Sequence, residues 1–299
     1  MKNSKWTNED IPNQSNKVII ITGATSGLGK QATKVLASRN AKVTMAVRNT
    51  QKAEVVVKEI LKDYPEAKIE ISQLDLNSLD SVKSFVETFT KNNKQLDILI
   101  NNAGVMMCPY SKTKDGFEIQ MGVNHLGHFA LTGLLMPLLM NTQSSRVVVT
   151  SSIAHKTGNI NFDDINWEYR QYNTNKAYSD SKLANLYFTH ELVRKFKGVE
   201  NAPLFTTAHP GWTKTELDRH SGTAEFLGNI LAQKVEMGTL PSLRAATDIN
   251  AQPGDFFGPK NFFEARGYPV KVKPNKMAKN EENAKKLWNL SEQLTGVKF

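Results

Sequence analysis

Cysteine is almost absent from this sequence, and its scarcity limits the environment that we expect. The 299 residues include one cysteine, Cys108. A lone thiol cannot form a disulfide within the chain, which favours a reducing compartment, and we expect the cytoplasm. Because the histidines also lack metal-ligand spacing and no second cysteine supports them, we expect no metal site.

Long apolar runs are missing as well. Residues 1–16 are polar, lack the apolar core of a signal peptide or membrane anchor, and are interpreted as an N-terminal extension. The most apolar later stretch, residues 129–140, is too short to cross a bilayer and predicts a buried helix. No Pro-, Gly- or Ser-rich linker and no repeat divides the chain, so we expect one domain over residues 1–299, with no transmembrane segment.

Acidic residues are outnumbered, with 29 Asp and Glu against 38 Lys and Arg, for a net charge of +9. One interpretation of this excess is a nucleic-acid binder. From residue 260 onward, however, nine Lys and Arg and four Glu are scattered, without the interleaved aromatic side chains that stack on bases. We therefore expect a solvated basic surface and no nucleic-acid partner, while attraction to phosphate-bearing cofactors or anionic membranes stays open.

Segments with strand and helix patterns alternate along the chain. Val18–Ile21 is a continuous β-branched run, which is typical of a strand buried on both faces. Further strands are predicted over residues 42–47, 68–74, 96–100, 146–150 and 204–208, and helices after residue 29 and over residues 50–62, 78–92, 117–140 and 177–196. This order predicts an α/β, Rossmann-type, doubly wound and mainly parallel sheet of about seven strands, with ligands beyond the carboxyl ends of the strands.

Three glycines, Gly23, Gly27 and Gly29, follow the first strand. A strand, a glycine turn and a helix together direct free backbone N–H groups and a positive helix end at a phosphate. Gly23 permits the turn, Gly27 lets a pyrophosphate approach, and Gly29 lets the helix pack closely on the strand. The alternative is a turn without a ligand. The polar motifs that end the later strands argue for the nucleotide site.

Tyr178 and Lys182 stand four residues apart in a predicted helix and therefore share a face. A nearby ammonium lowers the pKa of a phenol, which can then donate a proton to a forming alkoxide or remove one from an alcohol. Ser152 ends a predicted strand and can hydrogen-bond that oxygen, and Asn124 lies in the preceding long helix. The alternative, an ordinary surface pair, does not account for these partners.

The motifs resemble those of the short-chain dehydrogenase/reductase family along nearly the whole chain. The matching segments are Thr22–Gly29, Asp75-Leu76, Asn101–Gly104, Asn124, Ser151-Ser152, Tyr178–Lys182 and Pro210-Gly211. Further segments are similar to the branch with retinol dehydrogenases and protochlorophyllide reductases, namely Asn124–Phe129, Ser181–Asn185 and His209–Gly211.

Two features depart from this pattern. Ser152 and Tyr178 lie 26 positions apart, about twice the usual family interval, which predicts a loop near the mouth of the site. Retinol dehydrogenases also commonly carry an N-terminal membrane segment, which this sequence lacks. That difference puts retinoid specificity and membrane residence in doubt.

The resemblance implies roles for individual residues. Tyr178 is the expected general acid/base, and Lys182 lowers its pKa and holds the nicotinamide ribose. Ser152 orients and polarises the substrate oxygen, with Ser151 as its rival, and Asn124 holds through its backbone a water that links Lys182 to solvent. The expected cofactor-binding residues are Gly23, Thr25, Ser26, Gly27, Leu28, Gly29, Arg48, Asp75, Leu76, Asn102, Ala103, Gly104, Tyr178, Lys182, Pro210, Gly211 and Thr213.

The residue after the second predicted strand indicates which cofactor is bound. An NAD-preferring site places an acid there to hold the ribose 2′-hydroxyl, whereas this chain has Arg48. A guanidinium pairs with a 2′-phosphate that a carboxylate would repel, so NADP(H) is favoured. By resemblance, Asp75 meets the adenine amino group, Asn102 the adenine ribose, and Pro210-Gly211 the nicotinamide side. The alternative for Arg48 is a solvated surface cation.

These observations predict an NADP(H)-dependent oxidoreductase that interconverts an aldehyde or ketone and an alcohol on an apolar small molecule. A catalytically silent nucleotide sensor or scaffold is the alternative. Residues 212–240 are expected to form a substrate lid, since Gly222 and Gly228 make mobility plausible. By resemblance, helices 117–140 and 177–196 pair two subunits into a homodimer, and the alternative is that both faces pack within one subunit.

Overall fold

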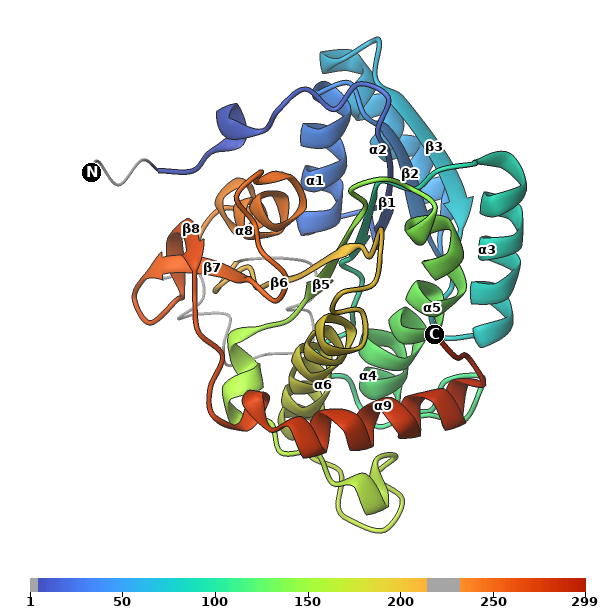
Figure 1. Cartoon of the computed structure of the whole chain (residues 1–299), viewed down its shortest axis with the longest axis vertical. Coiled ribbons are helices and arrows are strands. Elements are labelled where there is room, and N and C mark those ends of the chain that lie inside the picture. The colour runs from blue at the N-terminus through green and yellow to red at the C-terminus, as the bar shows by residue number, and fades with distance from the viewer. Residues whose placement is uncertain (1–4, 214–231) are drawn as a thin grey trace.

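The computed structural model describes residues 5–213 and 232–299, which form one eight-stranded sheet with the order β3-β2-β1-β4-β5-β6-β7-β8 (Figure 1). The strands are β1 (Val18–Thr22), β2 (Lys42–Val47), β3 (Lys68–Gln73), β4 (Ile98–Asn101), β5 (Arg146–Thr150), β6 (Leu204–Ala208), β7 (Phe256–Asn261) and β8 (Arg266–Lys271). Strands β1 to β7 pair in parallel, and β8 pairs antiparallel with β7. The mainly parallel sheet of about seven strands is confirmed, with eight strands in the described residues.

Helices cover both faces of this sheet, as a doubly wound fold requires. They are α1 (Gly27–Ser38), α2 (Thr50–Asp63), α3 (Leu79–Asn92), α4 (Ile119–Met121), α5 (Gly127–Met140), α6 (Thr174–Lys195), α8 (Val235–Thr247) and α9 (Glu281–Thr295). One apolar core joins the sheet to α1, α2 and α8, and another joins it to α3, α5, α6 and α9. Figure 1 shows α1 and α8 on one side of the sheet and α3, α5 and α6 on the other.

The long helix before β5 contains a local irregularity. Residues Gly122–Leu126 form a π-helical turn between α4 and α5, so the helical segment Ile119–Met140 is continuous. Of the helices in residues 5–213 and 232–299, this 22-residue segment is the one long and apolar enough to cross a membrane, but 78% of its most apolar 18 residues are buried. The prediction of a buried helix is confirmed, and the segment is longer than its most apolar part suggested.

The C-terminal residues cover the outer surfaces of α5 and α6. Helix α9 packs against α6, and Figure 1 shows the two helices crossing. At Gly133 in α5, an added Cβ would lie 2.6 Å from Val297 and 2.8 Å from the Phe299 ring. Parts of the surfaces that were expected to pair two subunits are therefore covered by the same chain.

Two segments named from the sequence are more tightly packed than expected. Within the N-terminal extension, Trp6 and Ile11 are buried in the core beside α1. Residues 214–231 of the predicted lid lie outside the described residues. The end of that predicted lid, residues 235–240, forms the first turns of α8, whose Leu240 is buried in the core.

Candidate active site

Four neighbouring strands end at the same edge of the sheet and bring separate motifs together. Strands β1, β4, β5 and β6 lie side by side in parallel. Their carboxyl ends lead into the glycine turn, Asn101–Gly104, Ser151-Ser152 and His209–Gly211 respectively. The predicted site residues at these four ends therefore share one edge.

The glycine turn allows backbone segments to approach closely. Gly23 has a φ of +68°, and an added Cβ would lie 2.9 Å from the Cα of Ala103. At Gly29 an added Cβ would lie 2.5 Å from the Gly23 carbonyl oxygen and 2.7 Å from the Asn102 amide nitrogen. Side chains at these positions would push the Asn101–Gly104 turn away from β1. Ser26, the N-cap of α1, makes no side-chain capping bond, so it leaves the first N–H groups of that helix to another acceptor.

A buried histidine joins the ends of β1 and β4 to the π-helical turn. The Thr22 hydroxyl accepts hydrogen bonds from the backbone N–H groups of Asn102 and Ala103, both at 2.9 Å. His128 Nδ1 donates to the Asn124 carbonyl oxygen at 3.1 Å, so its Nε2 accepts from the Thr22 hydroxyl at 2.9 Å. Burial lowers the pKa of His128 to about 4, which keeps the ring neutral. This connection could not be predicted from the sequence, because Thr22 and His128 are far apart along the chain.

Asn124 uses its side chain to hold the β4 turn and helix α6 together. Its Oδ1 accepts from the Val105 N–H at 2.8 Å, and its Nδ2 donates to the Val105 carbonyl and to the Ser181 hydroxyl, both at 2.9 Å. The Ser181 hydroxyl donates in turn to the Tyr178 carbonyl at 2.7 Å. Asn124 lies in the π-helical turn, a feature that is frequent at functional sites.

Helix α6 carries Tyr178 and Lys182 on adjacent turns. The Lys182 Nζ lies 5.6 Å from the centroid of the Tyr178 ring, and Tyr178 is 7% exposed. Lys182 is 4% exposed, and burial lowers its pKa from 10.5 to about 8. An added Cβ at Gly104 would lie 3.5 Å from the Lys182 Nζ. The helix therefore holds a phenol beside a buried amine, next to the β4 turn.

The two serines after β5 have different surroundings. The Ser151 hydroxyl is buried and donates to the Lys182 carbonyl at 2.8 Å. Ser152 is half-buried and accepts from the Ala154 N–H at 3.2 Å, as the N-cap of the short helix Ile153–Thr157. The Ser151 hydroxyl is thus committed to the backbone of α6, whereas the hydroxyl hydrogen of Ser152 is not used by this cap.

A second group of predicted residues lies further along the sheet edge. Arg48 is exposed directly after β2, Asp75 is half-buried after β3, and Leu76 packs against Gly127. Strands β1 and β4 separate these residues from Ser152. The structure therefore does not bring Arg48, Asp75 and Leu76 together with Tyr178 and Lys182. The half-buried residues Thr25, Ser26, Gly27 and Leu28, at the start of α1, follow β1, which lies between these two groups.

The segment after β6 is tightly hydrogen-bonded. The Thr213 hydroxyl donates to the Pro210 carbonyl at 2.8 Å, and Gln233 Nε2 donates to the same carbonyl at 2.7 Å. Gly211 has a φ of +66°. These residues fix the backbone on both sides of residues 214–231.

The long interval between Ser152 and Tyr178 packs onto the segment that follows β4. Buried Glu118 accepts from the Tyr172 hydroxyl at 2.8 Å, while Gln120 donates to that hydroxyl at 2.9 Å and accepts from the Met107 N–H at 2.8 Å. Burial raises the pKa of Glu118 and raises that of Tyr172 beyond its usual range. The role of Glu118 was not recognised in the sequence, because its partner Tyr172 is distant along the chain.

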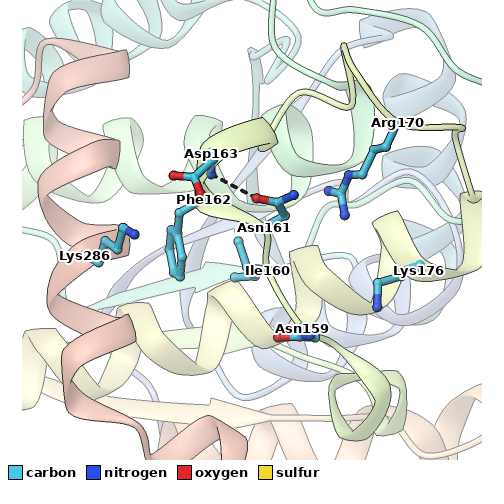
Figure 2. Close-up of a pocket in the computed structure, with 8 residues that line it drawn as sticks. All are labelled: Asn159, Ile160, Asn161, Phe162, Asp163, Arg170, Lys176 and Lys286. Atoms are coloured by element: carbon cyan, nitrogen blue, oxygen red, sulfur yellow. Dashed lines mark hydrogen bonds between the residues drawn. The ribbon is translucent and has the colours of Figure 1, made fainter.

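The same interval forms a surface pocket of about 410 Å³ with α6 and α9 (Figure 2). Its lining residues are Asn159, Ile160, Asn161, Phe162, Asp163, Arg170, Lys176 and Lys286. Arg170 stacks on the Trp167 ring at 3.5 Å and pairs with Asp164 at 3.4 Å, so it secures the loop. None of the predicted site residues lines this pocket. In residues 5–213 and 232–299, no group of three His, Cys, Asp or Glu side chains could hold a metal ion.

Comparison with known families finds a family model that matches most of the chain. Residues 17–225 match the family model for short chain dehydrogenase. Human retinol dehydrogenase 12 is 41% identical over 296 residues, which cover 98% of this chain and 90% of that protein. Human retinol dehydrogenase 13 is 40% identical, over 94% of this chain and 85% of that protein.

Solved structures have the same architecture. A crystal structure of a protein from Mycobacterium paratuberculosis superposes with a TM-score of 0.84 at 40% identity and covers 99% of each chain. A short chain dehydrogenase from Shigella flexneri, solved in complex with NADP, has a TM-score of 0.64 at 22% identity, over 82% of this chain and 97% of that one. The latter likeness concerns the fold.

Proposed function

The chain belongs to the short-chain dehydrogenase family, and from this premise we propose that it interconverts an aldehyde or ketone and an alcohol with NADP(H). The observation that carries the proposal is the buried amine of Lys182 beside the Tyr178 ring, at 5.6 Å from its centroid. Burying a lysine costs stability, and perturbed titratable groups gather at functional sites, so the burial of Lys182 points to a functional role.

The residues at the sheet edge fit a dinucleotide. Gly23 and Gly29 have no room for a Cβ, and the first N–H groups of α1 are not capped by Ser26, so a phosphate can accept from them. Exposed Arg48 would hold the 2′-phosphate, and Lys182 would hold the nicotinamide ribose. When bound, NADP(H) supplies or accepts the hydride. The remaining predicted contacts are Thr25, Gly27, Leu28, Asp75, Leu76, Asn102, Ala103, Gly104, Pro210, Gly211 and Thr213.

The chain's own residues would handle the proton and the substrate oxygen. Tyr178 donates the proton to the oxygen during reduction and accepts it during oxidation. Ser152 donates a hydrogen bond to the same oxygen, a role supported by its half-buried hydroxyl and by the committed hydroxyl of Ser151. Asn124 holds the Lys182 side of the site through Val105 and Ser181, and its backbone carbonyl is the proposed acceptor for a water that links Lys182 to solvent.

The substrate is proposed to be an apolar small molecule. Two relatives at about 40% identity are named for retinol, an apolar alcohol, which supports this class without naming the substrate of this chain. The alternative is a silent nucleotide sensor of the same fold. A silent protein has no need for a buried amine beside Tyr178, so the geometry favours the enzyme.

Substitution of Tyr178 by Phe tests the proposal. The change keeps the ring but removes the hydroxyl, so turnover should fall by about 10²–10⁴, the usual contribution of a positioned acid or base. Carbonyl compounds and alcohols would be screened with NADPH and NADP⁺ by absorbance of the reduced nicotinamide, and NADPH affinity should change only a few-fold.

Tyr187→Phe is the matched control, because Tyr187 is also buried in α6 but donates to the Met277 carbonyl at 3.0 Å. It should keep wild-type turnover. Near-normal turnover by Tyr178→Phe would show the mechanism to be wrong. A wild type that binds NADPH tightly but turns over no compound in a broad screen would favour the silent sensor.

A further inference from the structure

The tip of the β7–β8 hairpin, residues 261–266, packs against the backbone that follows β6. The Trp212 N–H donates to the Ala265 carbonyl at 2.7 Å. An added Cβ at Gly211 would lie 2.4 Å from that carbonyl oxygen. The positive φ of Gly211 and this close contact both require glycine, so the hairpin tip and residues 209–213 fit each other closely.

A buried histidine makes the second contact between these segments. His209 Nδ1 accepts from the Gly211 N–H at 3.2 Å, so the ring proton is on Nε2, which donates to the Glu264 carboxylate at 3.1 Å. Burial lowers the pKa of His209, which keeps the imidazole neutral in this arrangement. Gly258 in β7 makes room for the ring, because an added Cβ would lie 2.1 Å from Nε2.

Glu264 also reaches the turn that begins at Ser152. Its other carboxylate oxygen accepts from the Lys156 Nζ at 3.1 Å, and Lys156 lies in the short helix that Ser152 caps. His155, in the same helix, donates from Nδ1 to the Ser152 carbonyl at 2.6 Å. One carboxylate therefore bridges the segments that follow β5 and β6.

The backbone at the hairpin tip is held in a costly conformation. Phe262, Phe263 and Glu264 have φ values of +52°, +54° and +70°, and left-handed conformations are unfavourable for side chains such as these. Such strain persists where the surrounding contacts determine it, and it gathers at functional sites. The contacts here are those of Glu264 with His209 and Lys156.

We propose that Glu264 is a positioning residue for the reaction. Through His209 and Lys156 it sets the separation between Ser152, which meets the substrate oxygen, and Pro210-Gly211, which meets the nicotinamide side of the cofactor. This role rests on the proposed function, because it concerns the two edges between which hydride transfer would take place.

Three variants test this inference. Glu264→Ala removes both contacts, and Glu264→Gln keeps an oxygen that can accept from His209 but loses the charge that pairs with Lys156. Asp255→Asn is the matched control, because Asp255 pairs with Lys271 at 2.7 Å elsewhere on the same hairpin. Steady-state kinetics, NADPH binding, unfolding midpoints and amide hydrogen exchange would be measured for each.

Glu264→Ala should lower kcat by about 10- to 100-fold, since small displacements of reacting groups have effects of this size, with NADPH affinity within a few-fold of wild type. The kcat of Glu264→Gln should be intermediate between those of wild type and Glu264→Ala. Asp255→Asn should keep the wild-type kcat, although its loss of stability should be comparable to that of Glu264→Ala. In Glu264→Ala, amide exchange should accelerate in residues 153–157 and 209–213. In Asp255→Asn it should not.

The exchange measurement separates the two proposals. A wild type without turnover would overturn the proposed function. Amide hydrogen exchange would still show whether Glu264 links residues 153–157 to residues 209–213. Unchanged exchange in residues 153–157 and 209–213 of Glu264→Ala would overturn the positioning role. So would a kcat that falls equally in Glu264→Ala and Asp255→Asn, or one that stays at the wild-type value in Glu264→Ala.

Discussion

Lys182 carries an amine into a part of the site that has little contact with water. Its pKa is lowered to about 8 by burial, so the folded state disfavours the charged form. Below about pH 8 the amine is charged in both the folded and unfolded chains, so the full cost of burying the charge lowers the free energy of unfolding. As the pH rises from about 8 toward the ordinary value of 10.5, the folded protein has already released its proton and the cost disappears.

Lys182→Met should therefore stabilise the protein in neutral solution while it damages the reaction. The expected gain in the free energy of unfolding is on the order of 3 kcal/mol near pH 7 and should decline toward zero by about pH 10.5. Urea unfolding at several pH values measures this. Lys91→Met, at an exposed position of α3, should show no such pH-dependent gain. Equal stability of Lys182→Met and wild type at pH 7 would contradict the predicted cost.

We propose that Arg48 determines cofactor choice, since its exposed guanidinium follows β2. Arg48→Ala should weaken NADPH binding by about 1.5–3 kcal/mol, the usual value of a hydrogen bond to a charged group, and leave NADH binding nearly unchanged. Titration of both cofactors measures the difference. Lys58→Ala removes an exposed charge from α2 and should affect neither cofactor. Equal losses for NADPH and NADH would refute the assignment.

Contacts within one helix could be predicted from the sequence, whereas contacts between residues distant along the chain could not. The spacing of Tyr178 and Lys182 predicts their shared face, because a helix brings residues four apart together. Glu264 and Glu118 carry no comparable signal, since their partners His209 and Tyr172 are more than 50 positions away. Contacts of that kind arise from the chain's path in space.

At the level of elements, the turn between β1 and α1 depends on the absence of a side chain at Gly29. Gly29→Ala would place a methyl group 2.5 Å from the Gly23 carbonyl, which a helix cannot accept without moving. Overpacking of this kind costs about 1–3 kcal/mol. Chemical unfolding and NADPH titration should both reveal the loss. Gln31→Ala, two residues along α1, should change neither, and an unaltered Gly29→Ala variant would contradict the packing.

The strands show why some elements are predictable and others are not. The apolar runs of β1, β4 and β5 predict buried parallel strands, since helices cover both faces of such a sheet. Strand β7 contains Gly258, Pro259 and Lys260, and β8 contains Gly267 and Pro269, so neither has a strand pattern. Strand β7 pairs with β6, where Gly258 leaves room for the His209 ring, and β8 pairs in turn with β7. Tertiary contacts, which local composition does not encode, determine this end of the sheet.

For the whole molecule, the covering of α5 and α6 bears on assembly. Helix α9 packs against α6, and the ring of Phe299 contacts those of Phe129 and Trp288, at centroid distances of 5.0 and 4.6 Å. Of the two alternatives for these faces, the contacts favour packing within one chain. We expect light scattering at micromolar concentration to give one particle near 33.4 kDa.

Leu287→Asp tests whether α9 keeps the chain monomeric by covering the apolar faces of α5 and α6. Leu287 is 1% exposed in α9, so a carboxylate there would loosen the helix and uncover the apolar faces beneath it. The variant should associate as concentration rises, whereas Lys285→Asp at an exposed position of α9 should stay monomeric. A wild-type particle of twice the chain mass would contradict the expectation.

The same covering has a consequence for how the chain reaches its native state during synthesis. His125 at the start of the α5 region is hydrogen-bonded to Ser291 of α9, a separation of 166 residues. A ribosome therefore makes the apolar surface of α5 long before the residues that shield it. Closing so wide a loop is slow relative to local pairing, and uncovered apolar surface is what chaperones bind. The nascent chain should depend on such protection until α9 emerges.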